Sequence, residues 1–115
     1  MFRFEELEIW KLSVEYGKDC YKISAEFPKH ETYSLSDQLR RAGLSTSNNI
    51  AEGSVGSSAN FRKYINLSIG SVLETVNIIN FACEVGYCKP ETKKEMYLKA
   101  ETLIRKMRSF SASLR

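Results

Sequence analysis

The most constraining feature of this sequence is a long line of apolar residues between Phe61 and Cys83. Its members recur at steps of three or four residues, as on one face of an α-helix: Phe61, Ile65, Ile69, Val72, Val76, Ile79 and Cys83. The pattern predicts a helix over about residues 59–86, ended by Gly86, which can adopt the left-handed backbone of a helix C-terminus. At about 1.5 Å per residue such a helix is roughly 40 Å long.

Three other segments have the same helical spacing, and turn residues separate them. They predict helices over about residues 5–26, 34–52 and 90–112. Ser34 is expected to cap the second of these, with Asp37 three residues later in a capping-box-like position. No stretch alternates with period two for long enough to form a strand. The sequence therefore predicts one all-α domain over residues 1–115, an antiparallel up-down-up-down four-helix bundle.

Composition excludes several classes of protein. The hydrophobic content of 43% and the charged content of 27% fit a folded globular chain and not a disordered one. No apolar run approaches the ~20 residues of a membrane span, and the N-terminal stretch is acidic without the apolar core of a secretion signal. We therefore expect a cytoplasmic protein without a membrane partner. The three cysteines are expected to be reduced thiols, and their spacing with the single His30 predicts no metal site and no cofactor.

The stretch from Gln38 to Gly53 has a small and polar face where a core helix would carry leucine and isoleucine. Steps of three and four residues along it give Gln38, Ala42, Ser45, Asn49 and Glu52. Such a face either packs closely against another helix or meets a polar partner.

Folding the predicted 34–52 and 59–86 helices back on each other about residue 56 gives this face a partner. Gln38 then lies near Glu74, Arg41 near Ser71, Ala42 near Gly70, and Ser45 near Leu67. A half-buried carboxylate needs a partner, because an unpaired buried charge is costly. We therefore expect a structural polar cluster made of Gln38, Arg41, Ser45, Asn49, Glu52 and Glu74. We also expect the two backbones to approach closely at the small residues Ala42, Gly43 and Gly70.

The net charge of +3 is unevenly distributed along the chain. Residues 89–115 carry eight basic and three acidic side chains, whereas residues 1–88 carry nine basic and eleven acidic ones. A basic final helix is compatible with an anionic partner, although charged helix faces are usually only solvated. The candidate phosphate contacts are Arg40, Arg41, Arg62 and Lys63, with the lysines of the last helix behind them.

Two of these arginines have structural alternatives. Arg41 also belongs to the expected polar cluster, and Arg40 is placed for an interface salt bridge. Arg40 is expected to be the more exposed of the two. No basic motif interleaved with aromatic residues is present, so sequence-specific readout of bases is unsupported.

Several motifs in the first three predicted helices match a known family. They are Phe4, Leu7 and Trp10; Phe27-Pro28, Glu31 and Tyr33; Leu35; Gln38-Leu39-Arg40-Arg41-Ala42; Ser45; Asn49-Ile50-Ala51-Glu52-Gly53; and Gly70-Ser71 with Glu74. On these residues the chain resembles the four-helix-bundle proteins encoded within 23S ribosomal RNA intervening sequences. It is also similar to the related accessory variability determinant proteins of diversity-generating retroelements. The resemblance implies a bacterial cytoplasmic protein that assembles into a ring-like homopentamer.

The two branches of this resemblance differ in what they imply about function. The retroelement branch implies nucleic-acid binding in support of a reverse transcriptase, whereas the ribosomal branch implies no defined molecular role. The sequence departs from the family pattern at Ser54-Val55, where a basic residue is expected after the glycine, and at Gly43, where a larger residue is common. The missing basic residue predicts phosphate binding that is weaker or located elsewhere.

Two functions remain open on this sequence. The first is a non-enzymatic nucleic-acid-binding oligomer, in which ring assembly multiplies a modest basic surface that contacts RNA or DNA. The second is a structural scaffold that docks a protein partner without direct nucleic-acid binding, favoured by broad apolar helix faces. An enzyme is not predicted, because Glu52 and Glu74 are expected far apart and His30 has no nucleophile at a recognisable spacing. The glycine-rich GSVGSS segment also lacks the lysine of a phosphate-binding loop.

Overall fold

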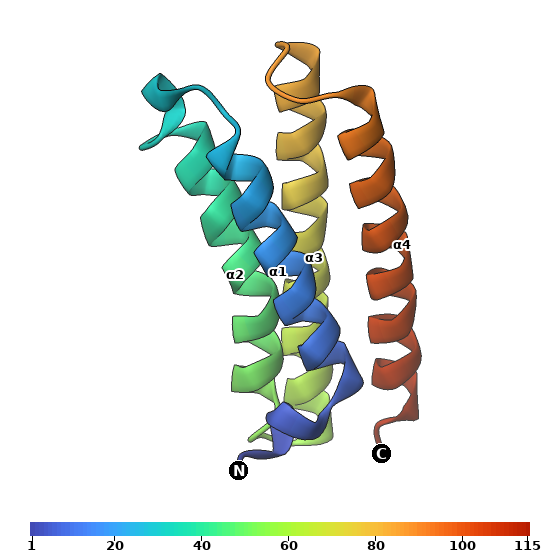
Figure 1. Ribbon diagram of the computed structural model, residues 1–115. Helices are drawn as coiled ribbons and strands as arrows, with labels where there is room; N and C mark the ends of the chain where they lie inside the picture. Colours follow the sequence, from blue (N-terminus) through green and yellow to red (C-terminus); the bar gives the residue numbers. More distant parts are fainter.

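Four long α-helices run alternately up and down in the computed structural model, which describes all 115 residues (Figure 1). They are α1 (Glu8–Ala25), α2 (Leu35–Gly53), α3 (Ser58–Glu84) and α4 (Pro90–Ser113), with short 3-10 turns η1 (Arg3–Glu6) and η2 (Lys29–Glu31) before α1 and α2. The fold contains no strand, so the predicted all-α class is confirmed. The molecule measures 45 × 24 × 21 Å, and both chain ends lie at the same end of it (Figure 1).

The core of the molecule lies along the apolar lines that the helical spacing predicted. α2 packs extensively against both α1 and α3, α4 packs against α3, and the contact of α1 with α4 is the smallest of these four. Two of the lines are buried in the centre: Phe61, Ile65, Ile69, Val72 and Ile79 of α3, and Met96, Ala100, Leu103 and Met107 of α4. Burial of large apolar side chains, at about 1.5–3 kcal/mol each, is what holds the helices together.

Two helix boundaries differ from the predicted ones. Residues Arg3–Glu6 form a separate 3-10 turn, and Leu7 has an extended backbone (φ −79°, ψ 130°), so α1 begins later than residue 5. The third helix ends at Glu84 and not near residue 86. Gly86 follows it with a φ of 85°, which confirms the predicted left-handed residue at this point of the chain.

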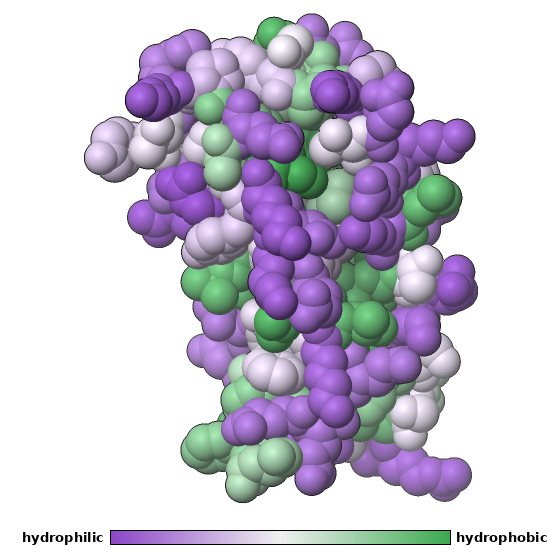
Figure 2. Space-filling view, viewed as in Figure 1, coloured by the Kyte–Doolittle hydropathy of each residue, from purple (hydrophilic) through white to green (hydrophobic).

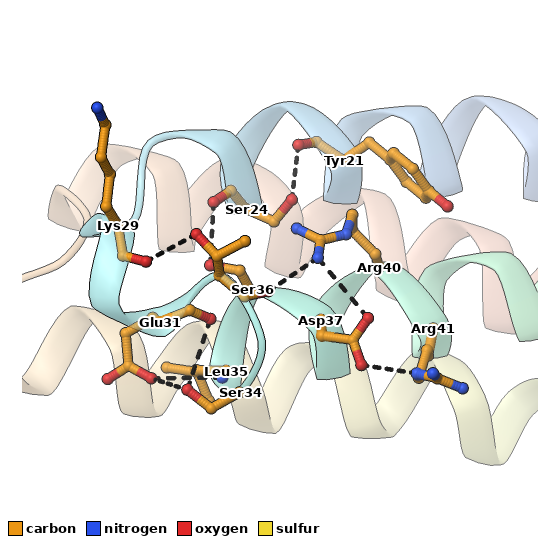
Figure 3. Close-up of polar contacts among 11 residues, drawn as sticks. Tyr21, Ser24, Lys29, Glu31, Ser34, Leu35, Ser36, Asp37, Arg40 and Arg41 are labelled. Atoms are coloured by element: carbon orange, nitrogen blue, oxygen red, sulfur yellow. Dashed lines mark hydrogen bonds and ion pairs between the residues drawn. The ribbon is translucent and has the colours of Figure 1, made fainter.

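The N-terminus of α2 is capped by a glutamate and not by the predicted capping box. The Ser34 hydroxyl makes no cap bond and donates instead to Glu31 Oε1 (2.5 Å), which also accepts the Leu35 N–H (3.3 Å; Figure 3). Tyr87 O–H donates to the other carboxylate oxygen of Glu31 (2.8 Å) and ties this end to the connection between α3 and α4. These hydrogen bonds, that of Ser34 first, lower the pKa of Glu31. Asp37 is left free to bind arginine.

Gly17 and Gly43 permit a close approach of α1 to α2, and the prediction that Gly70 brings α2 and α3 together is wrong. A Cβ on Gly17 would stand 3.0 Å from the Gly43 carbonyl oxygen, and one on Gly43 would stand 2.8 Å from Cys20 Cβ. No atom lies within 4 Å of the place where a Cβ on Gly70 would be. α3 therefore turns Gly70 outward, away from the other helices of its own chain.

By length and composition alone, α3 is long and apolar enough to cross a membrane. This is weak evidence for a membrane span, because the core helix of a soluble protein passes the same test. Only 44% of its most apolar window is buried inside the protein. An unusually apolar helix therefore leaves much of its surface uncovered.

Candidate nucleic-acid interface

Arg40 and Arg41 stand near the start of α2, on either side of Asp37 (Figure 3). Arg40 Nη2 donates to the Thr32 carbonyl oxygen (3.0 Å) and lies 3.7 Å from Asp37 Oδ1, and its side chain is 28% exposed. Arg41 Nε donates to Asp37 Oδ2 (2.7 Å), and its side chain is 79% exposed. The hydrogen bond to Asp37 raises the pKa of Arg41. The expectation that Arg40 is the more exposed is wrong, because its guanidinium closes the loop that leads into α2.

Arg62 and Lys63 lie near the start of α3, at the opposite end of the bundle from Arg40 and Arg41 (Figure 1). Arg62 Nη1 donates to the Leu114 carbonyl oxygen (3.3 Å), which places its guanidinium beside the end of α4. Lys63 is exposed and forms no ion pair. The structure therefore does not bring the four predicted phosphate contacts together on one surface.

The polar face of α2 meets α3 through hydroxyl groups. Asn49 Nδ2 donates to the Ser45 carbonyl oxygen (2.9 Å) and to its Oγ (3.0 Å), and Ser71 Oγ donates to Ser45 Oγ (2.9 Å). Deeper in the contact, Ser68 Oγ donates to the Thr46 carbonyl oxygen (2.6 Å), and both residues are fully buried. The partner of Ser45 lies one helical turn further along α3 than predicted, and this register decides which α3 residues face α2.

The remaining members of the predicted polar cluster stay apart. Gln38, Glu52 and Glu74 are exposed and have no side-chain hydrogen bond or ion pair within the chain. Arg41, the expected partner of Glu74, is bound to Asp37 instead. The predicted contact is therefore absent, and the Glu74 carboxylate on the outer side of α3 lacks a counter-charge in its own subunit.

Two lysines of α4 are neutralised by carboxylates that face them. Lys99 Nζ lies 3.0 Å from Asp19 of α1 and 3.2 Å from Glu95, and the hydrogen bond to Asp19 is the main cause that raises the pKa of Lys99. Lys106 Nζ lies 3.2 Å from Glu8 of α1. These two lysines therefore join α4 to α1 and are poorly placed to bind an external anion.

Three other cations of α4 are exposed and form no ion pair: Lys94, Arg105 and Arg108. Helical spacing puts all three on the side of α4 that is opposite its buried apolar line, and we call this set the α4 stripe. It extends over about 21 Å from Lys94 to Arg108 at the rise of an α-helix. Glu91 and Glu101 are exposed acidic residues on the same side that no cation neutralises. The α4 stripe is therefore a linear, net-positive surface.

An aromatic ring lies beside the upper end of the α4 stripe. Tyr97 is half exposed and lines a shallow depression of about 450 Å³ together with Lys93, Lys94 and Glu101. This combination was not among the predicted contacts, although a lysine pair followed one helical turn later by tyrosine is visible in the sequence. A ring flanked by ammonium groups can stack on a nucleobase while the lysines bind the adjacent phosphates.

Residues 5–109 match the family model described as 23S rRNA-intervening sequence protein. The chain belongs to this family. The match covers α1, α2, α3 and most of α4, so every residue of the α4 stripe lies within the part typical of 23S rRNA-intervening sequence proteins. The family description names an rRNA intervening sequence and no enzymatic activity. No curated protein sequence matches the chain significantly.

Proposed function

We propose that this 23S rRNA-intervening sequence protein is a non-enzymatic oligomer that binds RNA or DNA through the α4 stripe. The observation that carries the proposal is the sorting of charge on α4. Its cations that face α1 are paired with carboxylates, whereas Lys94, Arg105 and Arg108 are exposed and unpaired. Unpaired lysine and arginine bind phosphates without regard to sequence and release counterions as they do so. Arg62, which donates to the Leu114 carbonyl oxygen, adds a further cation beside the end of α4.

The position of Tyr97 favours nucleic acid with unpaired bases. An exposed ring stacks on a base only where that base has left a duplex, and stacking is tolerant of base identity. The stripe offers no set of side chains for reading base edges, so we expect a preference for loops and single strands without sequence specificity.

Assembly strengthens this function. The family resemblance implies a homopentamer in the bacterial cytoplasm, and each subunit would add one α4 stripe to the ring. A modest affinity per subunit then becomes a high affinity for any nucleic acid long enough to reach several stripes.

The proposal is tested by fluorescence anisotropy with a labelled stem-loop RNA across a range of salt concentrations. Arg105→Gln with Arg108→Gln removes two charges from the stripe, and Lys11→Gln with Lys29→Gln removes two exposed charges elsewhere. We expect the stripe variant to bind at least about tenfold more weakly and its log–log salt slope to fall by about two, because each phosphate contact contributes about 0.9 to that slope. The control variant should bind like the parent. Equal affinity of all three proteins would contradict the proposal.

A protein scaffold without direct nucleic-acid binding is the second candidate function. It is supported by large exposed apolar side chains on α3, including Leu67, Leu73 and Phe81. Binding measurements at low ionic strength distinguish the two functions. A parent protein that assembles normally but has no affinity for RNA or DNA under those conditions would favour the scaffold.

A further inference from the structure

The outward side of α3 is an exposed apolar surface in the middle of the chain's longest helix. Leu67, Leu73 and Phe81 are 49%, 54% and 58% exposed, and the exposed Gly70 and Glu74 lie among them. We call these five residues the α3 face. A surface of several large apolar side chains on one helix is typical of an interaction site and not of a solvated helix.

Contacts within its own chain do not explain why residue 70 is a glycine (Gly70). Glycine inside a helix is unfavourable relative to alanine, and it is usually kept where another backbone or side chain leaves no room for a Cβ. Gly17 and Gly43 meet that condition, but a Cβ on Gly70 would have no neighbour within 4 Å. The bare backbone at Gly70 is therefore explained if a second chain approaches the α3 face there.

An apolar groove between α1 and α2 has the matching shape. It has a volume of about 720 Å³, and the close approach of Gly17 to Gly43 forms its floor. The apolar side chains that line it are Phe4, Trp10, Val14, Tyr21, Leu44 and Ala51. We call this site the α1–α2 groove. In the view of Figure 2, apolar patches flank the hydrophilic ridge that runs down the middle of the molecule.

Charge and length are complementary between the α3 face and the α1–α2 groove. Glu74 on the face has no partner in its own chain, and Lys22 on the edge of the groove is exposed without an ion pair. Leu67 to Phe81 extends over about 21 Å, and Trp10 to Lys22 over about 18 Å, at the rise of an α-helix. The α3 face, with its one unpaired carboxylate, therefore fits a groove with one free ammonium group.

We propose that the α3 face of one subunit packs into the α1–α2 groove of a second copy of this chain. The proposal rests on the oligomeric form of the proposed function and names the two surfaces that build it. Because the two surfaces belong to different helices, the contact is heterologous, and its repetition gives a closed ring or an open filament. Neither surface includes the outer side of α4, so assembly leaves every α4 stripe uncovered.

Two variants with opposite defects test this arrangement. Phe81→Asp places a charge on the α3 face, and Leu44→Asp places one in the α1–α2 groove, both at side chains already about half exposed. We expect light scattering to give the mass of one subunit for each variant alone. Mixed in equal amounts, they should form a heterodimer, because each variant keeps one intact surface that fits the other. Circular dichroism checks that both variants remain folded.

Three outcomes would overturn the proposal. The first is a parent protein that has the mass of a single subunit. The second is a variant that keeps the parent mass when it is alone. Leu44→Asp would do so if two identical α3 faces formed the contact. The third is a mixture of folded variants that stays monomeric. Light scattering without nucleic acid measures assembly alone, so a failure to assemble is distinguishable from a failure to bind RNA. An assembled parent that does not bind RNA would contradict only the proposed function.

Discussion

Glycine shows at the scale of single residues how one residue type has different consequences on neighbouring helices. Gly43 is in contact with Cys20 and with the backbone at Gly17, whereas Gly70 faces open space. The sequence pattern predicted that the small residues Ala42 and Gly43 would lie close to Gly70 on the facing helix. The spacing shows only that a residue is small, and the rotation of each helix decides what it meets.

Alanine substitution should therefore have opposite effects at Gly43 and Gly70. In Gly43→Ala the new Cβ would stand 2.8 Å from Cys20 Cβ, so we expect the free energy of unfolding to fall by about 1–3 kcal/mol. In Gly70→Ala nothing is displaced, and we expect a gain of about 0.5–1 kcal/mol from helix propensity. Urea denaturation in the Phe81→Asp background measures both without a contribution from assembly. Shifts of the same sign in the two variants would show that this account of the glycines is wrong.

At the scale of the helices, one buried hydrogen bond joins α1 directly to α3. The Tyr16 hydroxyl lies 2.7 Å from Thr75 Oγ1, and both side chains are buried. Burial raises the pKa of Tyr16 and raises the pKa of the adjacent Cys20 to about 12. Both groups are therefore held in their neutral forms where α1, α2 and α3 meet.

This pair of groups predicts a loss of stability at alkaline pH. A group with a raised folded pKa stabilises fully below its unfolded pKa, which is about 8.5 for cysteine and about 10 for tyrosine, and the contribution is lost as the pH rises through the folded pKa. Each group can lower the free energy of unfolding by at most about 1.4 kcal/mol per pH unit. Tyr16→Phe should lose about 0.5–1.5 kcal/mol at neutral pH and show a shallower decline above about pH 10.

Urea denaturation from about pH 7 to about pH 11 measures this decline. Tyr97→Phe is the matched control, because Tyr97 is half exposed and outside the core. It should lose stability with pH as steeply as the parent. A Tyr16→Phe variant that declines as steeply as Tyr97→Phe would contradict the assignment of this effect to the buried phenol.

The helices themselves could be predicted from the sequence, and their polar contacts could not. The apolar lines of α3 and α4 identified the buried sides of both helices, since burial follows the helical repeat directly. The roles of Arg40 and Arg41 depend on Asp37. Asp37 was predicted to belong to the cap of α2, but Glu31 accepts the cap hydrogen bond and Asp37 binds arginine instead. Alternative local hydrogen bonds of this kind differ little in free energy, so the periodicity of the sequence does not show which of them forms.

The charges on α4 show that prediction of the candidate site from sequence has the same limit. The sequence identified the last helix as basic, but it ranked those lysines behind Arg40 and Arg41. Separating Lys99 and Lys106 from the α4 stripe requires knowing that Asp19 and Glu8 of α1 lie opposite them. This is a contact across some 80–98 positions of sequence, and no local pattern reports it.

At the scale of the whole molecule, the proposed assembly and the proposed nucleic-acid binding use separate surfaces. The α3 face and the α1–α2 groove would be covered between subunits, while the α4 stripe stays outward in each of them. Assembly should therefore change how many stripes one nucleic acid reaches, without changing the affinity of a single stripe.

This separation predicts that the effect of assembly depends on the length of the ligand. A long RNA should bind the assembled parent about 10²–10⁴-fold more tightly than the monomeric Phe81→Asp variant at equal subunit concentration. An oligonucleotide of about six nucleotides, which reaches a single stripe, should bind both proteins equally. Anisotropy titrations of both proteins with both ligands give the four dissociation constants. Equal weakening of long and short ligands in Phe81→Asp would mean that the substitution damages the stripe itself.

α4 makes fewer contacts than any other helix of the bundle, and its links to α1 include the exposed ion pairs Lys99–Asp19 and Lys106–Glu8. We expect a helix held in this way to detach in brief excursions while the other three remain folded, and its amide protons to exchange with solvent earlier than theirs. Dissolved salt screens those ion pairs and the phosphate contacts of the stripe alike. The helix that would hold the nucleic acid is therefore also the one expected to exchange first, and a bound strand would slow its amide exchange.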